Sequence, residues 1–375
     1  MEEADREASF RLERVSFGPG SPDDEWRRLR ARSAVGLVAE VDGRLAGQLW
    51  VRPYGQLFGG CSVPMAGIAG VGVEPWARGR GVALALLDAA LGAAHQAGQA
   101  VSALYTDVPP LYRRRGWEWA GVLEGLTLPP AELAPRVRAV AVEVRPAEAH
   151  DLDDLHRCYQ AVAAAQDGML DREGPSFSLP EVLTLDVVAL CPGRGYLTAT
   201  RRRDRLQVHD LVALDEEAGR ALLHLISSFA GTVSRIDLCP TDPAALGPLA
   251  GGVLTGEVQV TPWMLRVVDL PAAVAARGWP GAAWLADAAL DLEVVDPWAP
   301  WHAGRWRLVV EGGAVRCERG GTGSVSVQAR ALGPWFAGGT PTSSLRRAGL
   351  LDGGDATLLD ALAGVRGTPR MVDYF

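Results

Sequence analysis

The sequence predicts two successive α/β units followed by an α+β unit with an antiparallel sheet. Three observations support this fold class. Strand-like and helix-like patterns alternate over residues 35–128, as in a sheet covered by helices. The same order returns in weaker form over residues 142–230, which indicates an internal duplication. From Trp263 onward the composition changes, and short strands joined at Gly312–Gly313 indicate antiparallel pairing.

The first unit is expected to span residues 1–130. Its strands over 35–41 and 44–54 meet at Asp42–Gly43, a dipeptide typical of a two-residue hairpin. The full set of expected elements comprises a polar helix around residues 23–34, strands over 35–41, 44–54 and 63–73, a helix from Val82, a strand over 99–108 and a segment over 113–122.

The helix that begins at Val82 has one apolar stripe. Val82, Leu86, Ala90 and either Ala93 or Ala94 recur at helical spacing, and Leu87 and Leu91 adjoin them. Such a stripe predicts that the helix packs on a sheet.

The second unit is expected to span residues 140–262 and the third 263–375. In the second, a helix with acidic residues in its first turn follows Val142 and Val144, and strands over 195–214 precede a helix over 218–230. Acidic residues 215–217 occupy the helix mouth where the first unit has arginines and glycines, so this unit should lack an anion site. The third unit is expected to hold strands over 291–297, 304–320 and 323–332 and helices over 341–350 and 355–364.

Composition excludes several classes of protein. The 375 residues are 48% hydrophobic and carry a formal net charge of -8, which argues against nucleic acid as the main partner. The chain contains no lysine, so Schiff-base chemistry and a phosphate-binding P-loop are excluded.

Cysteine and histidine usage does not indicate a metal site. The five cysteines lie far apart and form no C-x-x-C pair, and the six histidines lack ligand spacing. We therefore expect no metal. The charged N-terminus and the lack of a long apolar run predict a cytoplasmic protein that does not bind membranes.

The most informative stretch joins a strand to the helix that begins at Val82. Arg78, Gly79, Arg80 and Gly81 precede Val82 and Ala83 in an R-x-x-G-x-A pattern. Small residues allow the backbone to approach a ligand, and the first N–H groups of a helix favour anions. A pyrophosphate fits this arrangement, although the dinucleotide fingerprint fails because Leu84 stands at its third glycine position.

A second signal follows about 30 residues later. Tyr112 begins a Y-x-x-x-G-W element that ends at Trp117. Together with the R-x-x-G-x-A helix start and the strand between them, it resembles the acetyl-CoA site of the GNAT N-acetyltransferases. Two such domains in tandem, a C-terminal domain similar to sterol carrier protein and a terminal phenylalanine resemble the Eis (enhanced intracellular survival) family within that group.

The resemblance implies roles for particular residues. Tyr112 would be the general acid, and the terminal carboxylate of Phe375 the general base, because the tail would fold back to the first unit. Acetyl-CoA would be the cosubstrate. The residues implied to bind it are Val71, Gly72, Val73, Arg78, Gly79, Arg80, Gly81, Val82, Ala83, Leu84, Asp107 and Val108.

The acceptor implied by the resemblance is a primary amine of an aminoglycoside, a polyamine-like molecule or a lysine side chain, and the implied assembly is a hexamer. Asp373, Trp26 and Trp50 are expected near this amine; for Trp26, packing of its helix onto the sheet is the alternative that we prefer. Two alternatives stay open: a noncatalytic protein whose third unit binds lipid or another small molecule, and an enzyme that uses a longer acyl-CoA.

Overall fold

The computed structural model describes residue 1, residues 3–18, residues 34–364 and residues 367–375. Most of the polar helix predicted around residues 23–34 lies outside this part of the chain, as does Trp26. The first unit contains η1 (Glu3–Asp5), α1 (Arg6–Phe17), β1 (Val35–Val41), β2 (Arg44–Phe58), β3 (Cys61–Val73), η2 (Pro75–Ala77), α3 (Val82–Gln96), β4 (Val101–Tyr105), α4 (Pro109–Arg113), β5 (Glu118–Leu128) and α5 (Pro130–Leu133).

The hairpin between β1 and β2 forms where the sequence predicts it. Asp42 and Gly43 both have positive φ, 55° and 70°, as a type I′ turn requires. β2 then continues to Phe58, four residues beyond its predicted end, and pairs with β3 along nearly its whole length.

The second unit repeats the order of elements. It contains β6 (Arg145–Pro146), η3 (Ala149–Asp151), α6 (Leu152–Ala163), η4 (Leu179–Thr184), β7 (Val187–Cys191), β8 (Gly195–Arg201), β9 (Arg205–Ala213), α7 (Glu216–Ser227), η5 (Ser228–Gly231), β10 (Arg235–Leu238), α8 (Pro243–Leu249) and β11 (Glu257–Val267).

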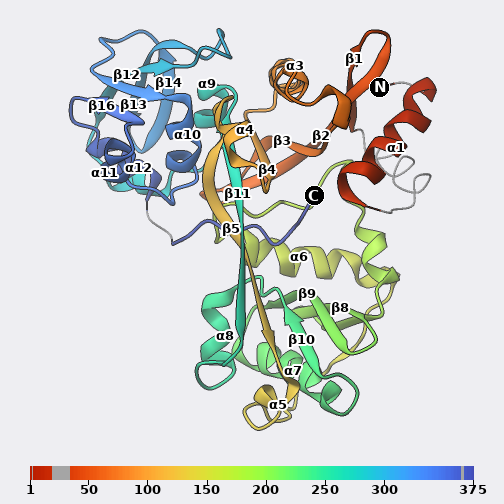
Figure 1. Cartoon of the computed structure of the whole chain (residues 1–375). Helices are drawn as coiled ribbons and strands as arrows, with labels where there is room; N and C mark the ends of the chain where they lie inside the picture. The colour runs from red at the N-terminus through yellow and green to blue at the C-terminus, as the bar shows by residue number, and fades with distance from the viewer. Residues whose placement is uncertain (2, 19–33, 365–366) are drawn as a thin grey trace.

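The two units share one sheet. Within the described residues its eleven strands run in the order β1-β2-β3-β4-β11-β5-β10-β9-β8-β7-β6. β11 pairs antiparallel with both β4 and β5 and thus fills a place inside the first unit, while the end of β5 pairs with β10 of the second. The long strands β5 and β11 run side by side from the upper to the lower half of the molecule (Figure 1). The predicted boundary between residues 262 and 263 falls inside β11.

The third unit has its own mainly antiparallel sheet, on which short helices pack. It contains α9 (Leu270–Ala276), η6 (Pro280–Trp284), β12 (Ala288–Val295), β13 (Gly304–Glu311), β14 (Ala314–Arg319), β15 (Val325–Gln328), α10 (Ala329–Phe336), α11 (Thr342–Arg347), β16 (Leu351–Gly353) and α12 (Thr357–Ala363). The strand predicted over 323–332 is wrong after Gln328. There α10 begins and buries Leu332, Trp335 and Phe336 in the core that this unit shares with β11.

Helix α3 packs on the first half of the long sheet as its stripe predicts. Val82, Leu86, Leu87, Ala90, Leu91 and Ala94 are buried against strand residues that include Leu49, Ile68 and Leu104. Burying one leucine or valine side chain contributes roughly 2 kcal/mol, so this face alone fixes the helix on the sheet.

The end of the chain returns to the centre of the molecule, between the first unit and α6 (Figure 1). Val122 N donates to Pro369 O at 3.0 Å, Met371 N donates to Val122 O at 3.1 Å, and Arg370 N donates to Asp167 O at 2.9 Å. The last residues are therefore held by both the first and the second unit.

Candidate functional site

An opening lies between the parallel strands β3 and β4. They pair only at Met65–Val101, Ala66–Ser102 and Gly67–Ala103, and β3 then runs six residues further to Val73. A bulge with Gly70 at φ 59° bends β3 within this stretch. Parallel strands that separate at their carboxyl ends leave backbone groups free to bind a ligand.

Val71, Gly72 and Val73 form the edge of this opening on β3. Glu74 N donates to Ala46 O at 2.9 Å, so Ala46 and Glu74 stand at a hydrogen-bonded position of the ladder and the next pair, Gly47 and Val73, stands at a non-hydrogen-bonded one. Antiparallel alternation then turns the N–H of Val73 away from β2, toward the side of β4. An edge strand with such free groups can accept an extended partner.

The loop before α3 has the backbone that its glycines allow. Gly79 and Gly81 have φ of 76° and 81°, and a Cβ at either position would meet no atom within 4 Å. The positive φ at both positions favours glycine, and the space beside each is open. Gly81 is the N-cap of α3 and supplies no side-chain cap, so the N–H groups of Val82, Ala83 and Leu84 keep no intrahelical partner.

The two loop arginines lie at the surface beside this helix end. Arg78 Nε donates to Val73 O at 3.4 Å, and Arg80 lies 3.7 Å from the exposed carboxylate of Asp42. Each guanidinium can reorganise toward an anion at small cost, because exposed ion pairs contribute little.

Asp107, Val108 and Tyr112 lie after β4, on the other side of the opening. Asp107 and Val108 are exposed, and Val108 N donates to Thr106 Oγ1 at 2.8 Å. Tyr112 is only 6% exposed and packs edge-on against Trp117, with ring centroids 6.4 Å apart. Burial raises the pKa of the Tyr112 hydroxyl to about 12, against the opposing effect of a hydrogen bond with Thr106, so the phenol is protonated at neutral pH.

Phe375 ends the chain at the point where β3 and β4 separate. Its ring lies 5.0 Å from that of Tyr54 and 5.9 Å from that of Tyr105, centroid to centroid. A Cβ on Gly67 would come within 2.8 Å of the Phe375 ring, so the absence of a side chain there makes room for the terminus.

The residues predicted to contact the amine do not lie together. Trp50 is buried near Met1 and Ala34, on the part of β2 that faces α1. Asp373 is close to the opening, but its carboxylate is paired with Arg172 at 3.1 Å. Asp373 therefore already has a cation partner inside the protein.

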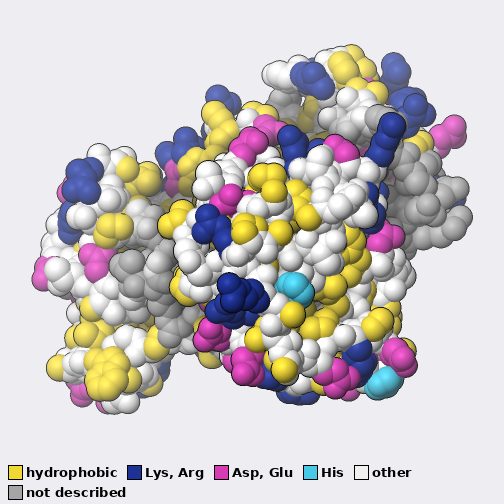
Figure 2. All heavy atoms as spheres, turned by 90° about the horizontal axis from the view of Figure 1, so that it is seen from below, with side chains coloured by type: hydrophobic (Ala, Val, Ile, Leu, Met, Phe, Trp, Pro, Cys, Tyr) yellow, Lys and Arg dark blue, Asp and Glu magenta, His cyan; other side chains and the backbone are white. Residues whose placement is uncertain are grey.

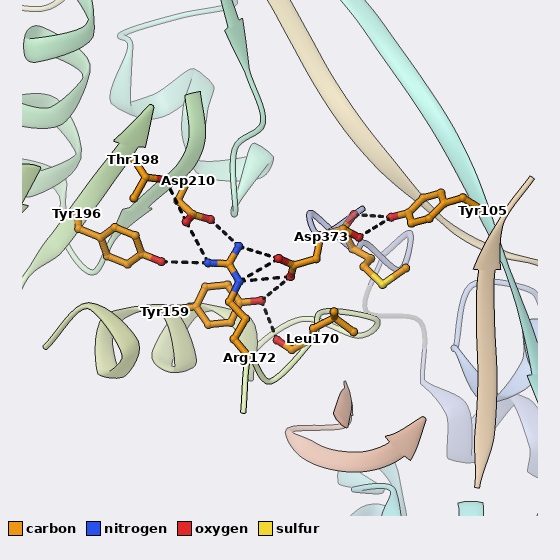
Figure 3. A network of polar contacts seen from close by, with 9 residues as sticks. Tyr105, Tyr159, Leu170, Arg172, Tyr196, Thr198, Asp210 and Asp373 are labelled. Carbon is orange, nitrogen blue, oxygen red and sulfur yellow. Dashed lines mark hydrogen bonds and ion pairs between the residues drawn. The ribbon is translucent and has the colours of Figure 1, made fainter. Parts of the chain in front are cut away.

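Sequence reasoning missed Arg172 and Asp210, which hold Asp373 in a buried cluster (Figure 3). Arg172 follows a loop and belongs to no motif, and Asp210 stands inside a predicted strand. Asp210 interrupts the apolar alternate positions Leu206, Val208 and Val212, and this is the one local signal that could have indicated it.

Two protein-family models match the chain. One, described as an acetyltransferase (GNAT) domain, matches residues 1–120, and the other, described as a sterol carrier protein domain, matches residues 270–371. The crystal structure of a GCN5-related N-acetyltransferase from Kribbella flavida is 31% identical, with a TM-score of 0.88 over 100% of this chain and 98% of that one. The chain belongs to the GCN5-related N-acetyltransferase (GNAT) family.

Further relatives agree with this assignment. An uncharacterised N-acetyltransferase of Streptomyces coelicolor is 27% identical over 85% of this chain and 80% of its own length. The structure of Eis1 from Mycobacterium abscessus is 26% identical, with a TM-score of 0.77 over 100% of this chain and 98% of that one. Membership in the Eis group stays a prediction, whereas the predicted fold class and the assignment as an acetyltransferase are confirmed.

The GNAT assignment makes acetyl-CoA the cosubstrate class, and the opening fits it. The space around Gly79 and Gly81 and the uncapped start of α3 suit a pyrophosphate, and the free edge of β3 suits an extended amide-bearing arm. Within the described residues, no group of three or more His, Cys, Asp or Glu side chains could hold a metal, and no helix is long and apolar enough to cross a membrane.

Proposed function

We propose that this GNAT protein transfers the acetyl group of acetyl-CoA to a primary amine at the opening between β3 and β4. The uncapped N-terminus of α3 carries the proposal. The N–H groups of Val82, Ala83 and Leu84 would hold the pyrophosphate, and Arg78 and Arg80 would add positive charge beside it. The remaining cosubstrate contacts would come from Val71, Gly72 and Val73 on one side and Asp107 and Val108 on the other.

Tyr112 would act as the general acid for the departing thiolate. A thiolate has a pKa of about 8.5 and needs a proton as it leaves, and a buried phenol is fully protonated in the working pH range. Val73 would contribute its N–H to the oxygen that gains charge when the thioester carbonyl is attacked.

The carboxylate of Phe375 would act as the general base for the amine. An α-carboxylate has a pKa of about 3.5 in water, so it takes a proton from an alkylammonium only in a desolvated setting or through water. The rings of Tyr54 and Tyr105 beside the half-buried Phe375 ring would exclude part of the water from this setting.

The acceptor we propose is a cationic amine: an aminoglycoside, a polyamine-like molecule or a lysine side chain. An acidic protein with a net charge of -8 attracts such molecules. On the face that Figure 2 shows, arginines lie among aspartates and glutamates rather than in an area of their own. A cytoplasmic location is a proposal that rests on the lack of a long apolar run in the sequence. A hexameric assembly is a proposal that rests on the likeness to Eis proteins.

Release of free thiol from acetyl-CoA in the presence of tobramycin or a lysine-containing peptide tests the function. We expect turnover to depend on the amine. Two glycines appended after Phe375 displace the terminal carboxylate while leaving the Phe375 ring in place, and should lower kcat by about a hundredfold. Unchanged turnover in this variant would exclude the terminus as base, and thiol release with none of the amines would remove the proposed acceptor class.

A further inference from the structure

The C-terminal segment is held from two sides. On the side of the first unit, the hydroxyl of Tyr105 lies 3.2 Å from both Met371 O and Asp373 O, and Tyr374 stacks on the Tyr105 ring at 4.6 Å. On the other side, the Asp373 side chain points toward the second unit (Figure 3).

Arg172 connects this side chain to the second unit. Its Nη1 and Nη2 donate to Asp210 Oδ2 and Oδ1 at 3.0 and 2.7 Å, and its Nε donates to Asp373 Oδ1 at 3.1 Å. The guanidinium is 8% exposed and lies 4.0 Å from the centre of the Tyr159 ring. A planar fork that binds two carboxylates at once fixes both distance and direction, which a lysine cannot do.

The backbone conformation of Arg172 indicates that its surroundings fix this residue in place. Its φ is 53°, in the left-handed region that non-glycine residues rarely adopt. Such a conformation persists where the surroundings determine it. Tyr159 helps to determine it, because its hydroxyl donates to Leu170 O at 2.7 Å, two residues before Arg172.

Asp210, which binds Arg172, lies where the parallel strands of the second unit separate. β9 pairs in parallel with β10 as far as Val208, and Asp210 stands two residues beyond, where β9 has left β10 and is still paired with β8. This is the counterpart of the place beside Gly67 where the Phe375 ring lies. The tail therefore runs from the opening of the second unit to that of the first.

We propose that Arg172 is a positioning residue for acetyl transfer: by binding Asp373 it sets where the terminal carboxylate enters the opening of the first unit. Two residues of extended chain reach at most about 7 Å, so a fixed Asp373 confines the terminus to a small volume. This inference rests on the proposed role of Phe375 as general base.

The test compares Arg172→Met, Asp373→Asn and the double variant, with Arg157→Met as control. Arg157 lies on α6 of the same unit, is 65% exposed and pairs only with Asp154 among the contacts described for it. Asp373→Asn leaves the Arg172–Asp210 pair intact, so this variant should fold even if Arg172→Met is unstable. We expect kcat to fall about tenfold to a hundredfold in both single variants, with little change in the Kd of acetyl-CoA or the KM of the amine.

Two further readouts separate positioning from a merely structural role. Because both substitutions break the same connection, the double variant should be no slower than the slower single variant. Carboxypeptidase A should release Phe375 faster from both variants than from the wild type or Arg157→Met. Wild-type kcat in Asp373→Asn, or a raised amine KM in Asp373→Asn alone, would overturn the proposal, the second result because it indicates direct contact between Asp373 and the amine.

Failure of the proposed function gives a different pattern. If the glycine-extended chain keeps full turnover, Phe375 is not the base, and the Arg172 proposal falls with it even if carboxypeptidase release changes. If the extended chain is slow while Arg172→Met and Asp373→Asn match the wild type, the result supports the Phe375 carboxylate as the base and overturns the positioning role of Arg172.

Discussion

Helices α3 and α7 occupy equivalent places in the two halves of the long sheet, and their first turns differ. α3 begins at an uncapped glycine with open space around it. α7 begins at Asp215, whose side chain accepts from Ala218 N at 2.9 Å, and Arg194 binds both Asp215 and Glu217 at 2.7 Å. One helix end leaves its N–H groups for a ligand, and the other satisfies them from within the chain.

The difference shows that a duplicated fold preserves architecture more readily than chemistry. Both units keep a strand that outruns its parallel neighbour and a helix that follows it. Among the described residues, only the first adds glycines and free amides at the start of this helix and a phenol after its short parallel strand. In the second, the opening is occupied by Arg172 and Asp210, and the helix start is closed by carboxylates.

The largest expected effect comes from the phenol that only the first unit has after its short parallel strand. Tyr112→Phe should lower kcat by about a hundredfold or more, while acetyl-CoA binds as before. Because burial raises the pKa of Tyr112 to about 12, the acid form is lost only as the pH rises through that value, so the wild-type rate should show no alkaline decline from this group below about pH 11. A pH–rate profile of kcat checks both points, and a wild-type decline near pH 9 that Tyr112→Phe abolishes would contradict the environment described for this phenol.

A smaller effect is expected when the N-cap of α3 is changed to aspartate, the residue that caps α7 in the second unit. Gly81→Asp should weaken acetyl-CoA binding by at least about tenfold, because the carboxylate competes for the free N–H groups and repels phosphate. Gly98→Asp is the matched control, since Gly98 also has positive φ, 72°, with no atom near a Cβ, but follows the other end of α3. Calorimetric titration with CoA measures both, and equal affinities would place the pyrophosphate elsewhere.

The smallest effect should follow removal of the cap in the second unit. Asp215→Ala should reduce the free energy of unfolding by about 1 kcal/mol without changing turnover. Hydrogen bonding by Arg194 lowers the pKa of Asp215, so the stabilisation is present above its unfolded-state pKa and is lost as the pH falls through the lower folded-state pKa. Thermal unfolding at pH 7 and at pH 3 should show the wild-type advantage shrinking in acid, and a changed kcat would argue against the separation of roles between the units.

The parts of the molecule predicted from the sequence are those with local signals. The stripe on α3, the Asp42–Gly43 hairpin and the glycines before Val82 each depend on neighbours within a few residues. The environment of Tyr112 was not predicted to the same depth, because Trp117 and the covering side chains of the apolar core act through the fold.

The parts that escaped prediction depend on partners far away in the chain. β11 enters the first unit between β4 and β5, more than a hundred residues after them, and its pattern alone does not reveal which strands it joins. Arg172 meets Asp373 across 201 residues. Residues 329–332 continue a strand-like pattern, but the large apolar side chains of α10 are buried more completely as a helix.

The strands β5 and β11 make the two units depend on each other. A chain that stopped after the first unit would leave β4 and β5 separated by a missing neighbour, with two exposed ladders prone to aggregation. Deletion of the second unit should therefore destabilise the first, whereas substitutions at the start of α7 leave the pairing of β11 with β4 and β5 intact. The first unit therefore depends on the second, because the last strand of the second completes the sheet of the first.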